Sequence, residues 1–229
     1  MTALATEGEI ASALQPLYVT LASNDIDAIF TLHLAATRAV GRPDLIKAES
    51  RDFFERILAG SGRAIGVVRD DALIAYGILQ LDLPLSEDAR PLLGLKRADR
   101  LAKLAGASVL PSAWGSGLHG ALIDRRIVEA RNLGIPHLYS TAAPGNTRSW
   151  GNLITAGFSI RGIIEKYGGH LRYLLYRDLS AGAPGEGNGM WCAAADIARQ
   201  RLLIAGGFAG TGWRRRADGG RDIYYREQA

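Results

Sequence analysis

Three closely spaced glycines give the sequence its clearest chemical signal. Gly115, Gly117 and Gly120 form the pattern G-x-G-x-x-G in the segment SAWGSGLHGAL, between a predicted strand and a predicted helix. Backbone amides in such a turn, together with the positive end of the helix dipole, form a binding site for phosphate groups. The alternative interpretation is that the glycines only supply backbone angles that a tight turn requires.

Two phosphate-binding motifs with similar letters fit this segment poorly. A dinucleotide-binding unit places its glycines after its first strand, with an acidic residue roughly 20 residues further on. Here several predicted strands precede the glycines, and the following strand, 137–142, reads HLYSTA without an acid. No Lys-Ser or Lys-Thr follows the glycines, so the P-loop pattern fails as well. A dinucleotide-binding oxidoreductase that uses GSGLHG stays as an alternative function.

The elements around the turn follow from apolar periodicity and from breaker residues. We expect strands at 17–23, 63–69, 72–82, 101–110, 137–142, 158–165 and 171–178, and helices at 25–40, 48–58, 118–133 and 147–156. Asp70 and Asp71 join two of these strands in an antiparallel hairpin. The proline-containing stretch 83–100 is expected to be a long connection with at most a helical turn. The pattern indicates an α/β fold.

The C-terminal part of the chain is set apart by composition. Residues 180–190 are rich in Gly, Ala and Pro and are predicted to be a linker. After it, 191–206 is expected to be helical and 208–226 a hairpin. The text RLLIAGGF in this part is similar to NLITAGF at 152–158, which indicates a reused supersecondary unit. Its hairpin is expected either to extend the main sheet or to pair with a second subunit in a homodimer.

Composition excludes several classes of protein. The chain has 229 residues, of which 48% are hydrophobic and 22% charged, as in a globular protein. No apolar run reaches the roughly 18 residues of a membrane span, and the N-terminus lacks a signal-peptide pattern, so a soluble cytoplasmic protein is expected. The only cysteine, Cys192, excludes an intrachain disulfide, and the histidines His33, His137 and His170 lack metal-ligand spacing, so no metal is expected. Arginine is the usual cation throughout, so the basic tail by itself does not favour nucleic-acid binding.

The order of elements and the glycine turn resemble the GNAT superfamily of acyl-CoA-dependent N-acyltransferases. That family has Arg or Gln, two residues, Gly, one residue, then Gly or Ala; here the three positions hold Trp114, Gly117 and His119. The segment NTRSWGNLITAGF from Asn146 and the ending YGGHLRYLLYRDL also resemble family segments. The resemblance implies a GNAT-like domain at 1–179, a mixed, largely antiparallel twisted sheet flanked by helices. The linker 180–190 and a helix-plus-hairpin appendage at 191–229 lie outside it.

The resemblance also implies a cofactor site for acetyl-CoA. Val109 and Leu110, at the end of a strand that splays from its neighbour, would bind the pantetheine arm through their backbone. The pyrophosphate would lie on the turn formed by Trp114, Gly115, Ser116, Gly117, Leu118, His119 and Gly120. Asn146 and Ser149 on the next helix match cofactor contacts, although Asn146 is equally a helix cap.

The implied reaction is direct attack of a primary amine on the thioester. Family members often protonate the thiolate with a tyrosine, where this chain has Leu153. Glu165 and Tyr139 are the candidates for the base by topology; the competing interpretations are a solvated carboxylate and a core tyrosine. The acceptor, a small molecule or a protein amine, would lie among the segments after Val40, 83–100 and 165–171. A non-catalytic acyl-CoA-sensing module is the alternative function.

Overall fold

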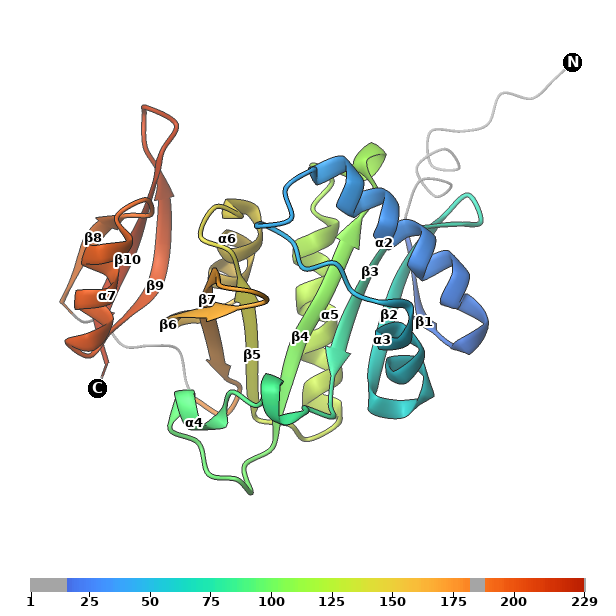
Figure 1. Ribbon diagram of the computed structural model, residues 1–229, viewed down its shortest axis with the longest axis horizontal. Coiled ribbons are helices and arrows are strands. Elements are labelled where there is room, and N and C mark those ends of the chain that lie inside the picture. Colours follow the sequence, from blue (N-terminus) through green and yellow to red (C-terminus); the bar gives the residue numbers. More distant parts are fainter. Residues whose placement is uncertain (1–15, 182–187, 229) are drawn as a thin grey trace, which may run out of the picture.

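Ten strands form one continuous twisted sheet in the computed structural model of the protein, which describes residues 16–181 and 188–228 (Figure 1). The strand order is β1-β2-β3-β4-β5-β7-β6-β9-β10-β8, and the β4–β5 pair is the parallel one among otherwise antiparallel neighbours. This mixed, largely antiparallel sheet with flanking helices is the predicted fold class. Most of the predicted linker, residues 182–187, lies outside the described residues.

The elements follow the predicted order as far as residue 178. The strands are β1 (Leu17–Leu21), β2 (Gly62–Arg69), β3 (Ala72–Gln80), β4 (Leu101–Val109), β5 (His137–Ala142), β6 (Ser159–Lys166), β7 (His170–Asp178), β8 (Gly189–Ala193), β9 (Phe208–Arg215) and β10 (Arg221–Glu227). The helices are α2 (Ile26–Val40), α3 (Arg51–Arg56), α4 (Arg90–Leu93), α5 (Leu118–Asn132), α6 (Thr147–Thr155) and α7 (Ile197–Ala205). Tight turns stabilise this order, because Asp70 and Asp71 both adopt positive φ between β2 and β3.

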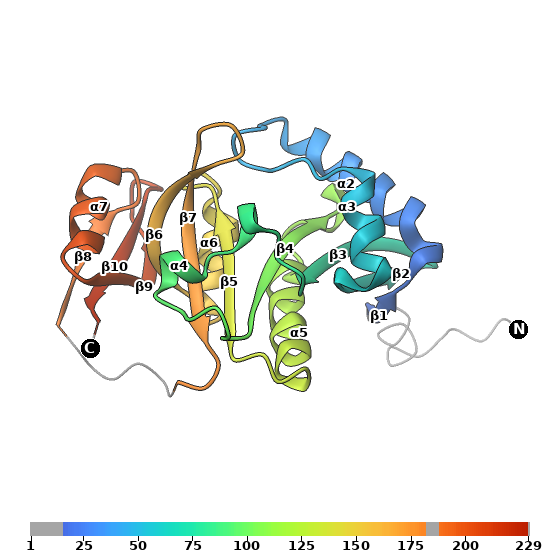
Figure 2. The same ribbon diagram turned by 60° about the horizontal axis from the view of Figure 1, so that its bottom comes forward.

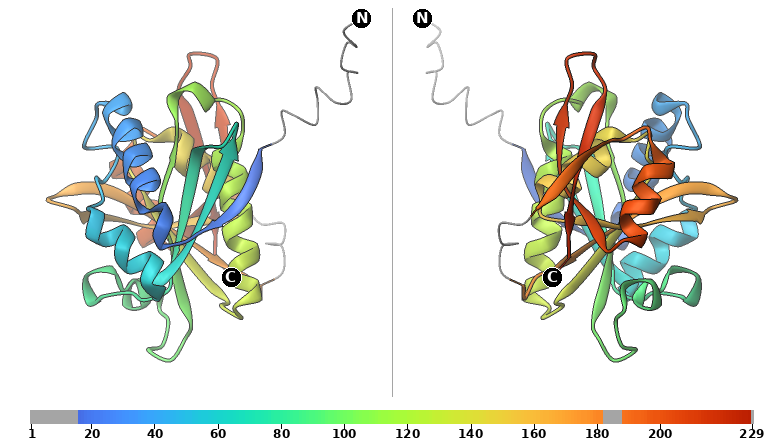
Figure 3. Two further views of the ribbon diagram at one scale, coloured as in Figure 1. Left: turned by 90° about the vertical axis from the view of Figure 1, so that its right-hand side faces the viewer. Right: turned by 90° about the vertical axis from the view of Figure 1, so that its left-hand side faces the viewer.

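The helices cover the two faces of the sheet unequally. Helices α2 and α3 lie on one face and α5 lies on the other, as the end-on views show (Figure 3). Their apolar stripes form separate cores: Ile29, Leu32 and Phe54 pack on the first face, while Ile123, Ile127 and Ala130 pack on the second. The strands between them are buried on both sides, so their geometry is fixed by packing from two directions.

Strands β4 and β5 separate after a short paired segment. Their register runs only from Leu101 opposite His137 to Lys103 opposite Tyr139. Just beyond it, the β3–β4 ladder is irregular between Gly77 and Leu79, and the buried Arg126 of α5 reaches this point. Its guanidinium donates to the carbonyls of Ile78 and Ala105 at 3.2 and 3.4 Å. Arg126 therefore satisfies carbonyls that the distorted ladder leaves without strand partners.

The C-terminal part differs from its prediction. Residues 189–193 form strand β8 in place of the start of the predicted 191–206 helix, and α7 begins only at Ile197. Hairpin β9–β10 extends the main sheet, because Ile160 of β6 pairs with Gly210 of β9. Among the two expectations for this hairpin, extension of the sheet within the chain is the one observed.

The last four elements repeat the preceding four in order and in sheet position. Strand, helix and hairpin β5-α6-β6-β7 lie in the order β5-β7-β6, and β8-α7-β9-β10 lie in the order β9-β10-β8 on the other side of the β6–β9 contact. Figure 3 shows α7 against its own hairpin, as α6 packs against the preceding one. The similarity of RLLIAGGF to NLITAGF therefore reflects a repeated structural unit.

Within the described residues, no helix is long and apolar enough to cross a membrane.

Candidate active site

The space between the separating strands is a cavity of about 870 Å³. One part, here called the glycine-turn half, is lined by residues 113–115 and 117–120 and by the start of α6. The other part, the Glu49 half, is lined by the segment 40–49 after α2, by the side chains of β4 and by Tyr167 and Arg172. Figure 2 shows the segment after α2 passing close to the tip of the β6–β7 hairpin. One cavity thus connects the two faces of the sheet.

The glycines of the turn are not explained by packing within the protein. Gly115 and Gly117 adopt φ of +86° and +80°, which other residues rarely adopt. Gly120 lies in the first turn of α5 without a positive φ, where alanine would favour the helix. A Cβ added at any of the three would meet no protein atom within 4 Å. The turn therefore leaves open space in front of a helix N-terminus, as a phosphate group requires.

The end of β4 departs in part from the predicted site. Val109 lines the cavity, but its carbonyl accepts a hydrogen bond from the indole N–H of Trp114 at 2.9 Å. Leu110 does not line the cavity, and its amide donates to Ile74 at 2.9 Å. Ser116 is also outside the lining, with its hydroxyl bonded to the Ala113 carbonyl. Trp114 thus fixes the turn to the strand.

His119 lies between the turn and α6. Its Nδ1 is 2.8 Å from the side-chain amide nitrogen of Asn152, so Nδ1 is the acceptor and Nε2 carries the proton. Burial, and then the charge of Arg126, lower the pKa of His119 to about 4. The ring is therefore neutral at physiological pH, and His119 lines the cavity with one ring N–H still available as a donor.

The start of α6 completes the glycine-turn half. Asn146 and Ser149 both line the cavity, and the Asn146 side chain also caps the helix by accepting from the Ser149 amide at 3.2 Å. Asn146 therefore caps α6 and also borders the cavity. Leu153 reaches the same wall but is 3% exposed and belongs to the main core, so this wall offers an apolar side chain and no proton donor at position 153.

The Glu49 half contains a carboxylate that the sequence did not single out. The Glu49 side chain is 8% exposed and forms an ion pair with Lys47 at 2.8 Å. It lies against β4, since a Cβ on Gly106 would be 3.7 Å from Glu49 Cγ. This puts the Glu49 side chain over β4 at Gly106, within the cavity.

A hydrogen-bonded chain holds Glu49 in place. The Glu49 amide donates to Nε2 of the buried His33 at 2.9 Å, and His33 Nδ1 is 2.8 Å from the Tyr76 hydroxyl. Ser108 of β4 donates to the same hydroxyl at 3.3 Å. Burial lowers the pKa of His33 and raises the pKa of Tyr76, so both groups stay neutral. The chain therefore positions Glu49 relative to β4 and adds no charge.

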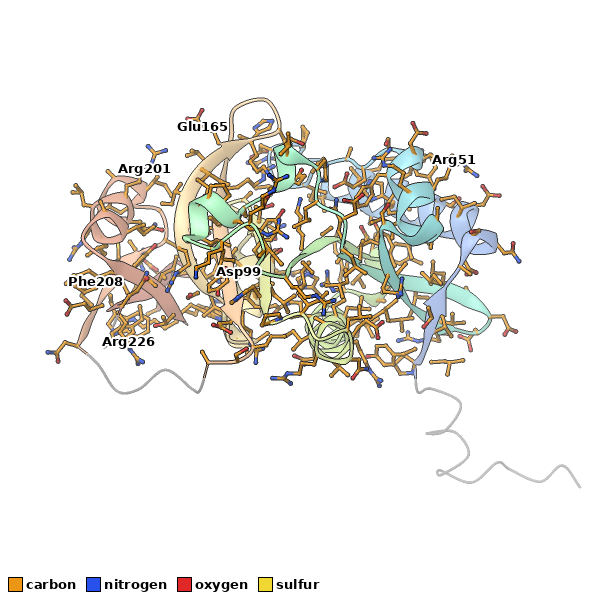
Figure 4. All side chains as sticks on the ribbon, turned by 90° about the horizontal axis from the view of Figure 1, so that it is seen from below. Arg51, Asp99, Glu165, Arg201, Phe208 and Arg226 are labelled. Carbon is orange, nitrogen blue, oxygen red and sulfur yellow. The ribbon has the colours of Figure 1, made fainter. Side chains whose placement is uncertain are left out.

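Neither predicted base lines the cavity. Glu165 is exposed at the outer side of the hairpin (Figure 4), and Tyr139 is completely buried beneath the paired part of β4 and β5. The Tyr139 hydroxyl donates to the Glu87 carbonyl, and burial raises its pKa. Topology identifies the open end of the sheet but does not say which way a side chain points, so it did not indicate that both residues lie outside the cavity lining.

Glu87 shows how the connection 83–100 contributes to the Glu49 half of the cavity. Its carboxylate pairs with Lys103 at 2.8 Å and with Lys166 at 2.6 Å, and these lysines come from β4 and β6. Burial opposes the charged form of Glu87, but the two lysines lower its pKa overall. The connection was expected to line the acceptor pocket; it supports the floor of the Glu49 half instead, without lining it.

The comparisons with known proteins agree on the fold. No protein-family model and no curated protein sequence matches the chain. Among solved structures, the ribosomal-protein-S18-alanine N-acetyltransferase of Escherichia coli is 16% identical, with a TM-score of 0.53 over 75% of this chain and 99% of that one. The yncA protein of Salmonella typhimurium, solved with its cofactor acetyl-CoA, is 17% identical, with a TM-score of 0.56 over 75% and 98%.

An N-acetyltransferase of Staphylococcus aureus Mu50 is also similar, at 17% identity and a TM-score of 0.56 over 72% of this chain and 99% of that one. The match covers almost the whole length of each of these three proteins, whereas about a quarter of this chain lies outside it. The chain accordingly has the fold of the GNAT N-acetyltransferases.

Proposed function

We propose that the protein transfers an acetyl group from acetyl-CoA to a primary amine by direct attack. The observation that carries the proposal is the single cavity that joins a glycine turn suited to phosphate with a buried carboxylate on the other side of the β4–β5 split. Binding of both substrates in one cavity turns a bimolecular reaction into a positioned one.

The glycine-turn half fits the phosphate-bearing end of the cofactor. The amides of Gly115, Gly117 and Gly120 would bind the pyrophosphate, and the absence of side chains there allows close approach. Neutral His119 would donate one hydrogen bond from Nε2 to a phosphate oxygen. The pantetheine arm would then follow the unpaired edge of β4 toward Gly106.

Glu49 is the residue we assign as general base. An amine attacks only when its nitrogen lone pair is free, so a carboxylate beside the thioester accepts the proton that the ammonium or the tetrahedral intermediate must lose. As the new C–N bond forms, the C–S bond breaks and the thiolate leaves with the cofactor. Glu49 replaces Glu165 and Tyr139 in this role because it alone among the three lines the cavity.

The leaving thiolate takes its proton from a source other than residue 153. Leu153 is apolar and has no proton to donate. Burial raises the pKa of the Tyr76 hydroxyl on the acceptor side, so this hydroxyl keeps its proton. The thiolate is then protonated either by solvent or by the proton removed from the amine.

Release of free CoA from acetyl-CoA over a panel of primary amines tests the proposal. Glu49→Gln should lower kcat by about 10²–10⁴-fold and leave acetyl-CoA affinity unchanged, because it removes a base and keeps the shape. Glu165→Gln, which changes an exposed carboxylate outside the cavity, is the matched control and should keep the parent rate.

Three results would decide against the proposal. Binding of acetyl-CoA without turnover on any amine would favour the sensing module. Binding of NAD(P)H without acetyl-CoA would favour a dinucleotide-binding protein. Loss of activity in Glu165→Gln with full activity in Glu49→Gln would reassign the base.

A further inference from the structure

Arg172 of β7 is a buried cation at the wall of the Glu49 half. The residue is 3% exposed and lines the cavity. Its Nη1 donates to the Leu171 carbonyl at 2.8 Å, whereas its Nη2 is buried without a hydrogen-bond partner among the described residues. A buried guanidinium nitrogen that lacks an acceptor is costly to the fold, so it indicates an acceptor brought by a ligand.

The neighbouring lysines are paired, which sets Arg172 apart. Lys47 has Glu49 at 2.8 Å, and Lys103 has Glu87 at the same distance. Within the described residues, no carboxylate lies within 4 Å of the Arg172 guanidinium. Asp44 is near enough to affect Arg172 electrostatically, but its carboxylate is already held by Arg42 at 2.8 Å. The Glu49 half therefore has an excess of positive charge, and Arg172 is its unpaired member.

Strand geometry directs Arg172 toward the acceptor side. Tyr173, the next residue, packs against Trp150 of α6 on the face that carries the glycine-turn half. Successive side chains of a strand point to opposite faces, so Arg172 points toward the segment 40–49. In this position Arg172 can contact the acceptor, and it lies away from the proposed site for the phosphates of the cofactor.

Tyr167 connects Arg172 with the proposed base. Its ring centroid lies 5.5 Å from the Arg172 guanidinium carbon and 4.9 Å from Lys47 Nζ, which is itself paired with Glu49. The backbone of Tyr167 is left-handed, with φ of +55°, and two glycines with positive φ follow it. The ring therefore contacts both cations, so Arg172 and the Lys47–Glu49 pair border the same part of the cavity.

We infer that the acceptor is an amino acid, whose carboxylate is bound by Arg172 while its amine lies toward Glu49. The inference rests on the proposed function. A guanidinium presents two parallel N–H donors that match the two oxygens of a carboxylate, which makes this pair specific as well as strong. Amines without an anionic group leave Nη2 unpaired and are poorer substrates.

Matched acceptor pairs test the inference on the parent protein. Glycine with glycinamide, β-alanine with β-alaninamide, and the L-amino acids with their α-amides each differ by one charge at nearly constant shape. For at least one pair we expect the free acid to exceed its amide in kcat/KM by at least about 10-fold, because the amide offers the guanidinium one acceptor oxygen and no negative charge.

Variants assign this preference to Arg172. Arg172→Gln should lower kcat/KM for the acid on the order of 100-fold, mainly through KM, while changing the rate with the amide little. Arg172→Lys should restore part of the preference, because lysine restores the positive charge but not the two parallel N–H donors. Arg161→Gln is the matched control: Arg161 is a half-buried arginine over Tyr176 in the neighbouring strand, outside the cavity lining.

The outcomes separate this inference from the proposed function. Equal use of acids and amides by the parent protein would overturn the inference and leave the transferase intact, whether or not the variants fold. Loss of acetyl-CoA affinity in Arg172→Gln would also overturn it, by assigning the residue to the cofactor. Failure of the parent protein to acetylate any amine would overturn both.

Discussion

The units β5-α6-β6-β7 and β8-α7-β9-β10 are built alike, yet only the first borders the cavity. Asn146 and Asp196 cap the two helices through equivalent side-chain bonds, at 3.2 and 3.0 Å. Asn146 faces the cavity because β4 lies beside β5 and separates from it, whereas β8 is the last strand of the sheet. A capped helix beside a strand therefore does not make a site; the split between two parallel strands does.

The two units also differ in how they fill the same buried position. Four residues after each cap, the first unit has Trp150 and the second has Gln200, and both side chains are completely buried. Trp150 packs edge-on against Tyr173 and against Trp213 of the second unit. Gln200 instead accepts hydrogen bonds from Tyr173 of the first unit and Tyr225 of its own, at 2.8 and 2.9 Å. Each position thus ties one unit to the other.

Trp150→Ala should have the largest effect. It removes a fully buried aromatic side chain from the contact between the units, and its indole also donates to the Pro144 carbonyl just before the Asn146 cap. We expect a loss of about 3–5 kcal/mol in the free energy of unfolding, measured by urea denaturation. A loss below about 1 kcal/mol would show that the two units are not packed together through Trp150.

Gln200→Leu should cost less and should not affect the site. The substitution keeps the volume but leaves the hydroxyls of Tyr173 and Tyr225 without their shared acceptor, at a cost of about 1–3 kcal/mol. Acetyl-CoA affinity should be that of the parent protein. A variant of unchanged stability would contradict the role of Gln200 as a buried link.

The two helix caps offer a matched comparison with a smaller effect. Asn146→Ala and Asp196→Ala should each cost about 1 kcal/mol of stability, because each removes one N-terminal cap. Only Asn146→Ala should also weaken acetyl-CoA binding in a calorimetric titration. Equal affinities in the two variants would mean that Asn146 is a cap and nothing more.

The sequence could predict what depends on neighbours along the chain. The glycine turn, the Asp70–Asp71 hairpin and the order of elements to residue 178 follow from local patterns, and the structure has them. The end of the predicted linker and the start of the predicted helix form β8 instead, because pairing with β10 overrides the helix preference of the alanines after Cys192.

The Glu49 half of the cavity depends on contacts distant in sequence. Glu49 is positioned by His33, Tyr76 and β4, and no spacing in the sequence predicts that arrangement. In the sequence, Arg172 is one residue in an alternating strand pattern. Only its burial and its missing hydrogen-bond partner in the structure distinguish it from the other arginine of the strand. Glu165 was favoured because it lies at the right end of the sheet, but it is exposed beside the cavity and not within it.

Titration of acetyl-CoA into Gly120→Ala tests the central claim most directly. Gly120 is helical and has open space in front of it, so alanine should raise the stability of the free protein by about 0.5–1 kcal/mol. If a phosphate of the cofactor lies against this turn, the added methyl group should weaken acetyl-CoA binding although the fold is more stable. A variant that gains stability and binds acetyl-CoA as tightly as the parent protein would contradict the placement of the cofactor on the glycine turn.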